Sequence, residues 1–337
     1  MYFQNLFLYR KMKVLVTGAN GLLGHHVVIE LLKQQHSVSI IVRNKTNIYF
    51  DLNKVKVTVG NFFDYENLKE AAQDCEAIIH IAALTSTHLL HYSDYEKINV
   101  EGSRNIINVS KALNINKIIY VSSSNTIGFE NNNSKFQENV AIQFPFSKSF
   151  YARSKVEAEQ LFMELSEQAN KQVIIINPTF MIGAWDVKPS SGKLMLMGYK
   201  KPLLFIPSGG KNFVAASYVA SVINEALNMN LNAEKFIVSG VNLSFRQFYE
   251  MQKSIGNFSQ RIIVLPNILL RFISIMGDFF RLLGLKTDIC SMNINQLLIQ
   301  ENYSDTKLKQ YINIPQQSLE KAIVEALNWF KNTGKIK

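Results

Sequence analysis

The fold is decided by residues 13–24, which read Lys-Val-Leu-Val-Thr-Gly-Ala-Asn-Gly-Leu-Leu-Gly. A short apolar run over residues 13–17 leads into three glycines, and an apolar helical pattern follows over residues 27–32. Such glycines allow a tight turn, let the backbone approach a pyrophosphate and let the helix pack closely on the strand. Because the strand and the helix flank the glycines, the motif predicts a dinucleotide site rather than a mere turn.

Five further β-branched runs follow along the first half of the chain. They are Ser37–Val42, Val55–Val59, Ala77–Ala82, Lys117–Ser122 and Gln172–Asn177. Each run except the first of these five is followed by a segment with helical periodicity. The runs are almost continuously apolar, as strands covered by helices on both faces require. The pattern predicts an α/β protein with a Rossmann-like, doubly wound parallel sheet of six or seven strands.

The pattern loosens after Pro178, where loop signals alternate with a helix at Ala216–Asn228 and a strand at Lys235–Ser239. We expect a dinucleotide-binding domain over residues 12–177, to which part of residues 212–240 returns. Residues 178–337 are expected to form mainly a smaller, mixed, substrate-binding lobe. Residues 1–11 are expected to be an N-terminal extension, because Met12 stands directly before the first strand. Their apolar stretch is too short for a signal peptide.

Composition narrows the class of protein further. Of the 337 residues, 47% are hydrophobic and 18% charged, so the chain can bury a large core. The formal net charge is +10, but the basic residues are scattered, so we expect a solvated basic surface and no nucleic-acid partner. The two cysteines, Cys75 and Cys290, have no CxxC or histidine partner at metal spacing. No disulfide scaffold or metal site is indicated, and a reducing, cytoplasmic location fits best.

The residue after the second β-branched run, Ser37–Val42, indicates whether the chain prefers NAD or NADP. Enzymes that prefer NAD place an acidic residue there on the ribose 2′-hydroxyl, whereas this chain has Arg43. A guanidinium can pair with a 2′-phosphate and stack on adenine, which favours NADP over NAD; the alternative is a solvated arginine at a strand end. Asn61, after the third run, is placed to bond the adenine edge, whereas Asp64 is expected to cap the following helix.

A tyrosine and a lysine supply candidate acid–base chemistry. Lys155 lies four positions after Tyr151, so the two lie on one face of a helix. A nearby ammonium favours the phenolate, so we expect Lys155 to lower the pKa of Tyr151 from its usual value of about 10. A tyrosine tuned in this way can donate or accept a proton near neutral pH.

With these motifs the chain resembles the short-chain dehydrogenase/reductase superfamily, in its extended, epimerase-like branch. The motifs that carry the resemblance are Thr17–Gly24, His80–Ala83, Asn99–Ser103, Val121–Ser123, Tyr151–Lys155 and Asn177–Thr179. Within the branch it is similar to the group of dihydroflavonol-4-reductases and 3β-hydroxysteroid dehydrogenases. That similarity is carried by Ile127-Gly128, Gly183–Pro189 and Tyr303–Leu308.

The resemblance implies roles for these residues. Tyr151 would protonate the carbonyl oxygen as hydride arrives from the nicotinamide, and Lys155 would hold the nicotinamide ribose. Ser123 would orient the carbonyl, since Gly128 lies five residues after it as in the family; Ser124 is the rival. The cofactor would be bound by Gly18, Asn20, Gly21, Leu22, Leu23, Gly24, Arg43, Asn61, Phe62, Ala82, Ala83, Ser122, Tyr151, Lys155, Pro178 and Thr179. In that set the glycines would serve the pyrophosphate, the alanines the ribose and nicotinamide, and Pro178 and Thr179 the nicotinamide face.

Departures from the family narrow the chemistry. The dehydratases that this chain resembles carry acidic residues beside the catalytic hydroxyl, whereas Ser124 and Asn125 stand there. Epimerases commonly show Tyr-Gly-Pro after the sixth strand, whereas this chain has Met181–Trp185. We therefore expect an oxidoreductase that exchanges NADP(H). The alternatives are a sugar epimerase that retains NAD and a non-catalytic dinucleotide-binding scaffold, although such scaffolds usually lose the tyrosine or the lysine.

Residues 267–283 are the most informative part of the second lobe. Their polar residues are Asn267, Arg271, Ser274, Asp278 and Arg281, and nearly everything between is Leu, Ile, Phe or Met. On a helix this gives one polar stripe and a very wide apolar face. Two interpretations compete: a helix mostly buried in the lobe, walling an apolar pocket, or an interfacial helix that contacts a membrane peripherally. The charged stripe excludes a simple transmembrane span.

Partners follow from the same observations. The phenylalanines between Ser123 and Tyr151 favour a mostly apolar small-molecule substrate, although ordinary packing accounts for several of them. The resemblance also allows a homodimer through the helices that flank the tyrosine, but no residue compels one.

Overall fold

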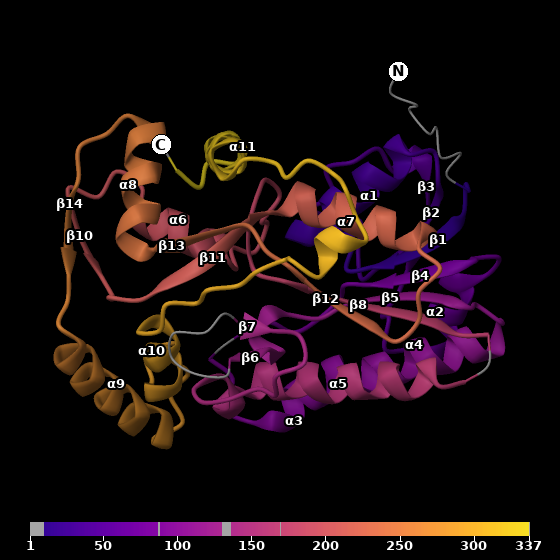
Figure 1. Ribbon diagram of the computed structural model, residues 1–337, viewed down its shortest axis with the longest axis horizontal. Coiled ribbons are helices and arrows are strands. Elements are labelled where there is room, and N and C mark those ends of the chain that lie inside the picture. The colour runs from indigo at the N-terminus through magenta and orange to yellow at the C-terminus, as the bar shows by residue number, and fades with distance from the viewer. Residues whose placement is uncertain (1–9, 87, 130–135, 169, 337) are drawn as a thin grey trace.

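The computed structural model describes residues 10–86, 88–129, 136–168 and 170–336 (Figure 1). Its main sheet contains β1 (Lys13–Thr17), β2 (Ser37–Val42), β3 (Val55–Val59), β4 (Ala77–His80), β5 (Lys117–Val121), β8 (Gln172–Pro178) and β12 (Glu234–Val238). All neighbours pair in parallel, in the order β12-β8-β5-β4-β1-β2-β3. The strand order reverses between β1 and β4, where such sheets bind ligands. The predicted Rossmann-like, doubly wound sheet is confirmed. Residues 1–9 of the predicted extension lie outside the described residues.

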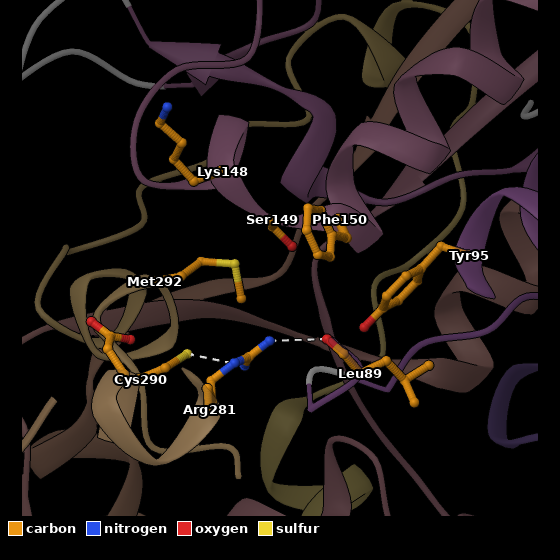
Figure 2. A pocket seen from close by; sticks show the side chains of 9 residues that line it. Leu89, Tyr95, Lys148, Ser149, Phe150, Arg281, Cys290 and Met292 are labelled. Atoms are coloured by element: carbon orange, nitrogen blue, oxygen red, sulfur yellow. Dashed lines mark hydrogen bonds between the residues drawn. The ribbon is translucent and has the colours of Figure 1, made fainter. Parts of the chain in front are cut away.

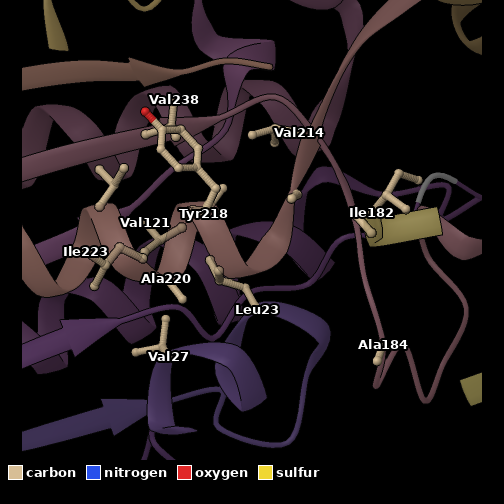
Figure 3. Packing of buried hydrophobic residues seen from close by; sticks show 14 of the residues in the cluster. Leu23, Val27, Val121, Ile182, Ala184, Val214, Tyr218, Ala220, Ile223 and Val238 are labelled. Atoms are coloured by element: carbon tan, nitrogen blue, oxygen red, sulfur yellow. The ribbon is translucent and has the colours of Figure 1, made fainter. Parts of the chain in front are cut away.

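Helices cover both faces of the sheet. They are α1 (Leu22–Lys33) and α7 (Ala216–Asn228) on one face, and α2 (Tyr65–Ala72), α4 (Glu101–Ala112) and α5 (Phe150–Ser166) on the other. Strand side chains alternate between the two cores: Val14 and Val16 pack with α1 and α7, whereas Leu15 packs with α2, α4 and α5. Figure 3 shows the first core, where Val27 of α1 and Ile223 of α7 belong to one cluster. Burial on both faces explains the continuous apolar runs.

The second lobe is smaller and mixed. Its sheets are β9 (Phe180–Ile182), β11 (Gly210–Ala215) and β13 (Val241–Ser244), and the pair β10 (Leu203–Ile206) and β14 (Arg261–Val264). Its helices are α6 (Gly192–Gly198), α8 (Phe245–Gly256), α9 (Asn267–Leu282), α10 (Ser291–Leu297) and α11 (Leu319–Asn332). The remaining elements are α3 (Tyr92–Tyr95), β6 (Gly128–Phe129) and β7 (Phe136–Gln137). β11 pairs in parallel with β9 and antiparallel with β13, so the predicted mixed lobe is confirmed.

Strand ends differ slightly from the prediction. β4 ends at His80 rather than at Ala82, because the Thr17 hydroxyl accepts from the N–H groups of Ile81 and Ala82 at 3.2 Å in place of a neighbouring strand. The ends of β5, β8 and β12 differ from the predicted ends by one residue. The helix at Ala216–Asn228 has the predicted bounds, and it and β12 join the main sheet. The domain boundary at residue 177 stays a prediction.

The interpretation of residues 267–283 as a mostly buried helix is wrong. α9 forms as expected, but most of its apolar side chains are exposed. Of its polar stripe, Ser274, Asp278 and Arg281 face the protein, with Ser274 only 2% exposed, whereas Asn267 and Arg271 are exposed. Asn267, Asp278 and Arg281 find hydrogen-bond partners in the neighbouring segments, which periodicity along one helix does not reveal.

Gly24→Ala tests the close packing of α1 on the glycine loop. An added Cβ would lie 2.0 Å from the Gly18 carbonyl oxygen and 2.7 Å from the Ala19 Cα, both backbone atoms. Overpacking costs about 1–3 kcal/mol, which exceeds the helix propensity of about 1 kcal/mol that alanine gains over glycine. We expect a lower free energy of unfolding in urea.

The matched control is Gly21→Ala, whose Cβ would lie 3.4 Å from the same oxygen, an ordinary contact. Its free energy of unfolding should fall by less than that of Gly24→Ala, since alanine at the N-cap costs at most about 1 kcal/mol relative to glycine. Equal stability of the two variants would contradict the proposed clash.

Candidate active site

The glycine loop forms a backbone cradle between β1 and α1. Gly18 has φ +74°, and a Cβ there would lie 2.7 Å from the Ala82 amide nitrogen. Gly21 donates its N–H to the Gly18 carbonyl at 3.0 Å and is the N-cap of α1 without a side-chain cap. The first N–H groups of α1 are therefore left to bind an anion. This geometry fits the pyrophosphate of a dinucleotide.

The side chains after Gly18 contribute differently. Leu22 and Leu23 are buried in the core, so only their backbone is available to a ligand, whereas Asn20 is half-buried. Ala82 and Ala83, also half-buried, follow β4 beside Gly18 and so line the same crevice. The structure thus brings the predicted glycines and alanines together.

Thr17 and His80 support this crevice, and the sequence analysis missed both roles. The Thr17 hydroxyl lies 2.8 Å from His80 Nδ1 besides accepting from the two backbone N–H groups after β4. Burial and, secondarily, the Lys155 charge lower the pKa of His80 to about 3, so the ring is neutral at pH 7. The pair fixes the backbone that carries Ala82.

The predicted adenine-side residues lie after β2 and β3. Arg43 is exposed directly after β2, and Asn61 is half-buried after β3. The Phe62 ring packs against His80 at 5.6 Å between centroids, and a Cβ on Gly102 would lie 2.5 Å from it. Phe62 thus packs against the core between the sheet and α2, α4 and α5, and its ring also contacts His80 below the crevice. Asp64 caps α2 by accepting from the Asn67 N–H, as predicted.

The catalytic candidates converge where β5 ends and α5 begins. Ser149 caps α5 and places Tyr151 in its first turn, while Ser123 begins the turn after β5. The Ser123 hydroxyl hydrogen-bonds to the Tyr151 side chain. Its rival Ser124 is buried, and its carbonyl accepts from the Tyr303 hydroxyl at 3.0 Å. The geometry therefore favours Ser123 as the partner of Tyr151.

The expected lowering of the Tyr151 pKa is wrong for this geometry. Burial raises the pKa of Tyr151, opposed by the Ser123 hydrogen bond and reinforced by the negative charge of Glu159. Lys155 does not lower it, because its ammonium donates to the Val121 carbonyl at 2.7 Å and lies 4.2 Å from the Tyr120 ring centroid. Burial lowers the pKa of Lys155 itself to about 7. Tyr151 is thus held as a protonated phenol at neutral pH.

Glu159 anchors this site and was missed from the sequence. Its carboxylate accepts from Thr126 at 2.7 Å, Asn177 at 2.8 Å and Lys235 at 2.5 Å. Asn177 also donates to the Ser123 carbonyl at 3.0 Å, which ties the serine turn to the same network. Its place four residues after Lys155 on one helical face is a signal that could have identified Glu159.

The remaining predicted cofactor residues are buried near the end of β8 and β5. Pro178 is buried, and Thr179 donates its hydroxyl to Asn212 at 2.7 Å, so the predicted contact with a nicotinamide is left to its methyl group. The Ser122 hydroxyl is buried and has no hydrogen-bond partner among the described residues. An unsatisfied buried hydroxyl beside the crevice fits a bound polar group.

A pocket of about 180 Å³ lies between the start of α5 and the inner side of α9 (Figure 2). It is lined by Leu89, Tyr95, Lys148, Ser149, Phe150, Asp278, Arg281, Cys290 and Met292. Arg281 crosses it and donates to the Leu89 carbonyl at 2.9 Å. Because Phe150 precedes Tyr151, the pocket adjoins the catalytic turn. It combines apolar walls with charged groups, so it suits a ligand that carries both.

Comparisons with known proteins agree with this architecture. The NAD dependent epimerase/dehydratase family matches residues 14–202. The putative dihydroflavonol 4-reductase of Synechocystis sp. is 28% identical, over 96% of this chain and 95% of that protein. The decarboxylating sterol-4-alpha-carboxylate 3-dehydrogenase of Dictyostelium discoideum is 22% identical, over 81% and 86%.

The fold also matches a solved structure, that of the Thermus thermophilus UDP-glucose 4-epimerase in complex with NAD. Its TM-score is 0.73 at 16% identity, over 95% of this chain and 99% of that one. The predicted resemblance to extended short-chain dehydrogenases/reductases and the prediction of an oxidoreductase are confirmed. The chain belongs to the NAD dependent epimerase/dehydratase family.

Proposed function

We propose that this protein is an NADP-dependent reductase of the ketone or aldehyde of a mostly apolar small molecule, or the reverse dehydrogenase. The observation that carries the proposal is the Ser123–Tyr151 hydroxyl pair, which follows β5 at the same edge of the parallel sheet as the glycine loop after β1. The names of the relatives support reduction and oxidation of carbon–oxygen bonds as the chemistry.

A bound nicotinamide would supply or accept the hydride, and the chain's own groups handle the proton. Tyr151 donates its phenolic proton to the carbonyl oxygen as hydride reaches the carbon, which leaves an alcohol and a phenolate. The Ser123 hydroxyl, already bonded to Tyr151, orients that oxygen. The raised pKa of Tyr151 suits this direction, because the phenol must carry its proton before the step.

Lys155 and Ser122 would hold the ribose, Arg43 the 2′-phosphate and Asn61 the adenine edge. Lys155 lies on α5 four positions after Tyr151, and Arg43 is exposed directly after β2, where a phosphate can reach it. An exchanged cofactor distinguishes this proposal from a sugar epimerase, which would retain NAD.

Tyr151→Phe tests the proton donor. General acid catalysis contributes about 100-fold or more, so we expect turnover of NADPH with an accepted ketone to fall by at least that factor. The dissociation constant for NADP⁺ should change little, because the phenol meets the carbonyl rather than the nucleotide. Tyr92→Phe is the matched control, since it removes only the hydroxyl that donates to Glu157. Undiminished turnover in Tyr151→Phe would remove this tyrosine from the mechanism.

Arg43→Asp tests the cofactor preference. A carboxylate would repel the 2′-phosphate and accept from a ribose 2′-hydroxyl, so the affinity ratio should shift toward NAD by about tenfold or more. NADPH and NADH binding can be followed by their fluorescence. Arg246→Asp, on the exposed side of α8, makes the same charge change away from the crevice. An unchanged ratio in Arg43→Asp would make Arg43 an ordinary surface residue.

Lys155→Met tests the burial of the ammonium. The pKa of about 7 lies below the value of about 10.4 expected in the unfolded chain, so the unfolded state holds one more proton between these pH values. The free energy of unfolding should therefore rise with pH from 7 to 9, by up to about 1.4 kcal/mol per pH unit from this group. Lys155→Met should lose that slope, whereas Lys45→Met, at an exposed position, should keep it. Equal slopes in Lys155→Met and wild type would refute the assignment.

A further inference from the structure

The outward face of α9 and the segment after it is almost wholly apolar. Its large side chains are 43–85% exposed, and they are Ile268, Leu269, Phe272, Ile275, Met276, Phe279, Phe280, Leu282, Leu283, Leu285 and Ile289. We refer to this set as the α9 face. Monomeric proteins rarely expose apolar patches of more than a few hundred Å², and larger ones mark interaction sites.

Contacts on the inner side fix the orientation of this helix. Asp278 accepts from the Ser291 N–H at 3.0 Å, and Arg281 donates to the Leu89 carbonyl at 2.9 Å. A Cβ on Gly277 would lie 1.8 Å from the Ile289 carbonyl oxygen, so the helix packs directly on the following segment. Rotating α9 to bury its apolar side chains would break these hydrogen bonds on the inner side. The inner contacts therefore keep the α9 face exposed to solvent.

The charge around the α9 face is positive. Residues 199–208 and 257–289, which form β10, β14, α9 and their connections, contain six basic and two acidic residues. Five of the basic side chains are exposed, namely Lys200, Lys201, Arg261, Arg271 and Lys286. Of the acids, Asp278 is turned inward and Asp288 forms a salt bridge with Lys193 at 3.4 Å. The surroundings of the face thus complement an anionic surface.

The same edge of the molecule offers further apolar contact. β10 exposes Leu203 and Phe205 on the strand pair that leads into α9. Figure 1 shows β10, β14 and α9 along one end of the molecule, with α10 on the inner side of α9. In the described part of the chain, no helix is both long and apolar enough to cross a bilayer. A 16-residue helix with one apolar side can instead lie in the interface plane.

We propose that the α9 face docks the protein on an anionic lipid bilayer, with its apolar side chains inserted among the acyl chains and its basic neighbours at the headgroups. A bilayer fits better than a second protein chain, because protein interfaces use about one hydrogen bond per 100–200 Å². The hydrogen-bonding groups of Asp278 and Arg281 are engaged on the inner side instead. The exposed side chains of the α9 face are aliphatic or aromatic and form no directional hydrogen bonds, so they can insert among acyl chains without a partner of matching shape.

The test is sedimentation of the full chain with vesicles of phosphatidylcholine containing about a quarter phosphatidylglycerol, compared with phosphatidylcholine alone. The wild type should sediment with the mixed vesicles, and less with phosphatidylcholine alone. Phe272→Ser with Phe279→Ser, at side chains 63% and 59% exposed, should lower the partition coefficient by about tenfold or more. Val241→Ser with Val324→Ser, 43% and 41% exposed on β13 and α11, should leave it unchanged.

A charge variant and two checks complete the experiment. Arg271→Glu with Lys286→Glu should reduce binding to the mixed vesicles while sparing the weaker binding to phosphatidylcholine. An unchanged thermal midpoint shows that each variant folds, and light scattering reports its oligomeric state. The proposal is overturned if the wild type does not bind mixed vesicles at low salt, or if the double serine variant binds them as well as the wild type. A wild-type dimer that this variant dissociates, without vesicle binding, would make a second copy the partner.

Discussion

The buried carboxylate of Glu159 holds the candidate active site together. It joins α5, which carries Tyr151 and Lys155, to the turn after β5, to β8 through Asn177 and to β12 through Lys235. A buried charge is tolerated only when it is paired and hydrogen-bonded, and Thr126, Asn177 and Lys235 together meet that need for Glu159. The position of Ser123 relative to Tyr151 depends on it, because Asn177 also bonds the Ser123 carbonyl.

The second constraint is the close approach of three backbone segments at the glycine loop. The Gly18 position leaves no room for a Cβ against Ala82, and Gly24 leaves none against Gly18. These contacts bring the start of α1 and the end of β4 to the edge of the sheet where the strand order reverses. The nucleotide cradle and the Glu159 network thus lie at the carboxyl ends of neighbouring parallel strands, where a hydride donor and a proton donor can meet one substrate.

Features that depend on local sequence patterns could be predicted from the sequence alone. The glycine spacing, the apolar strand runs and the Tyr151–Lys155 pair all follow from periodicity and steric needs within a few residues. The sequence was insufficient wherever partners come from distant segments. The Thr17–His80 contact and the role of Glu159 require the sheet register, and the pKa of Tyr151 depends on burial that spacing does not reveal. Periodicity predicted that α9 has a polar and an apolar side, but it did not predict which side faces the protein. The hydrogen bonds of Asp278 and Arg281 to neighbouring segments decide the orientation.

The most direct test of the account is calorimetric titration of the nucleotide-free protein with NADP⁺ and with NAD⁺, after analysis of any nucleotide released on stripping. An exchanging reductase with Arg43 at the end of β2 should bind NADP⁺ at least about tenfold more tightly, a difference of about 1.4 kcal/mol. Copurified NAD, or tighter binding of NAD⁺, would contradict the account and point to an epimerase that retains its cofactor. Binding of neither nucleotide would contradict the catalytic assignment itself.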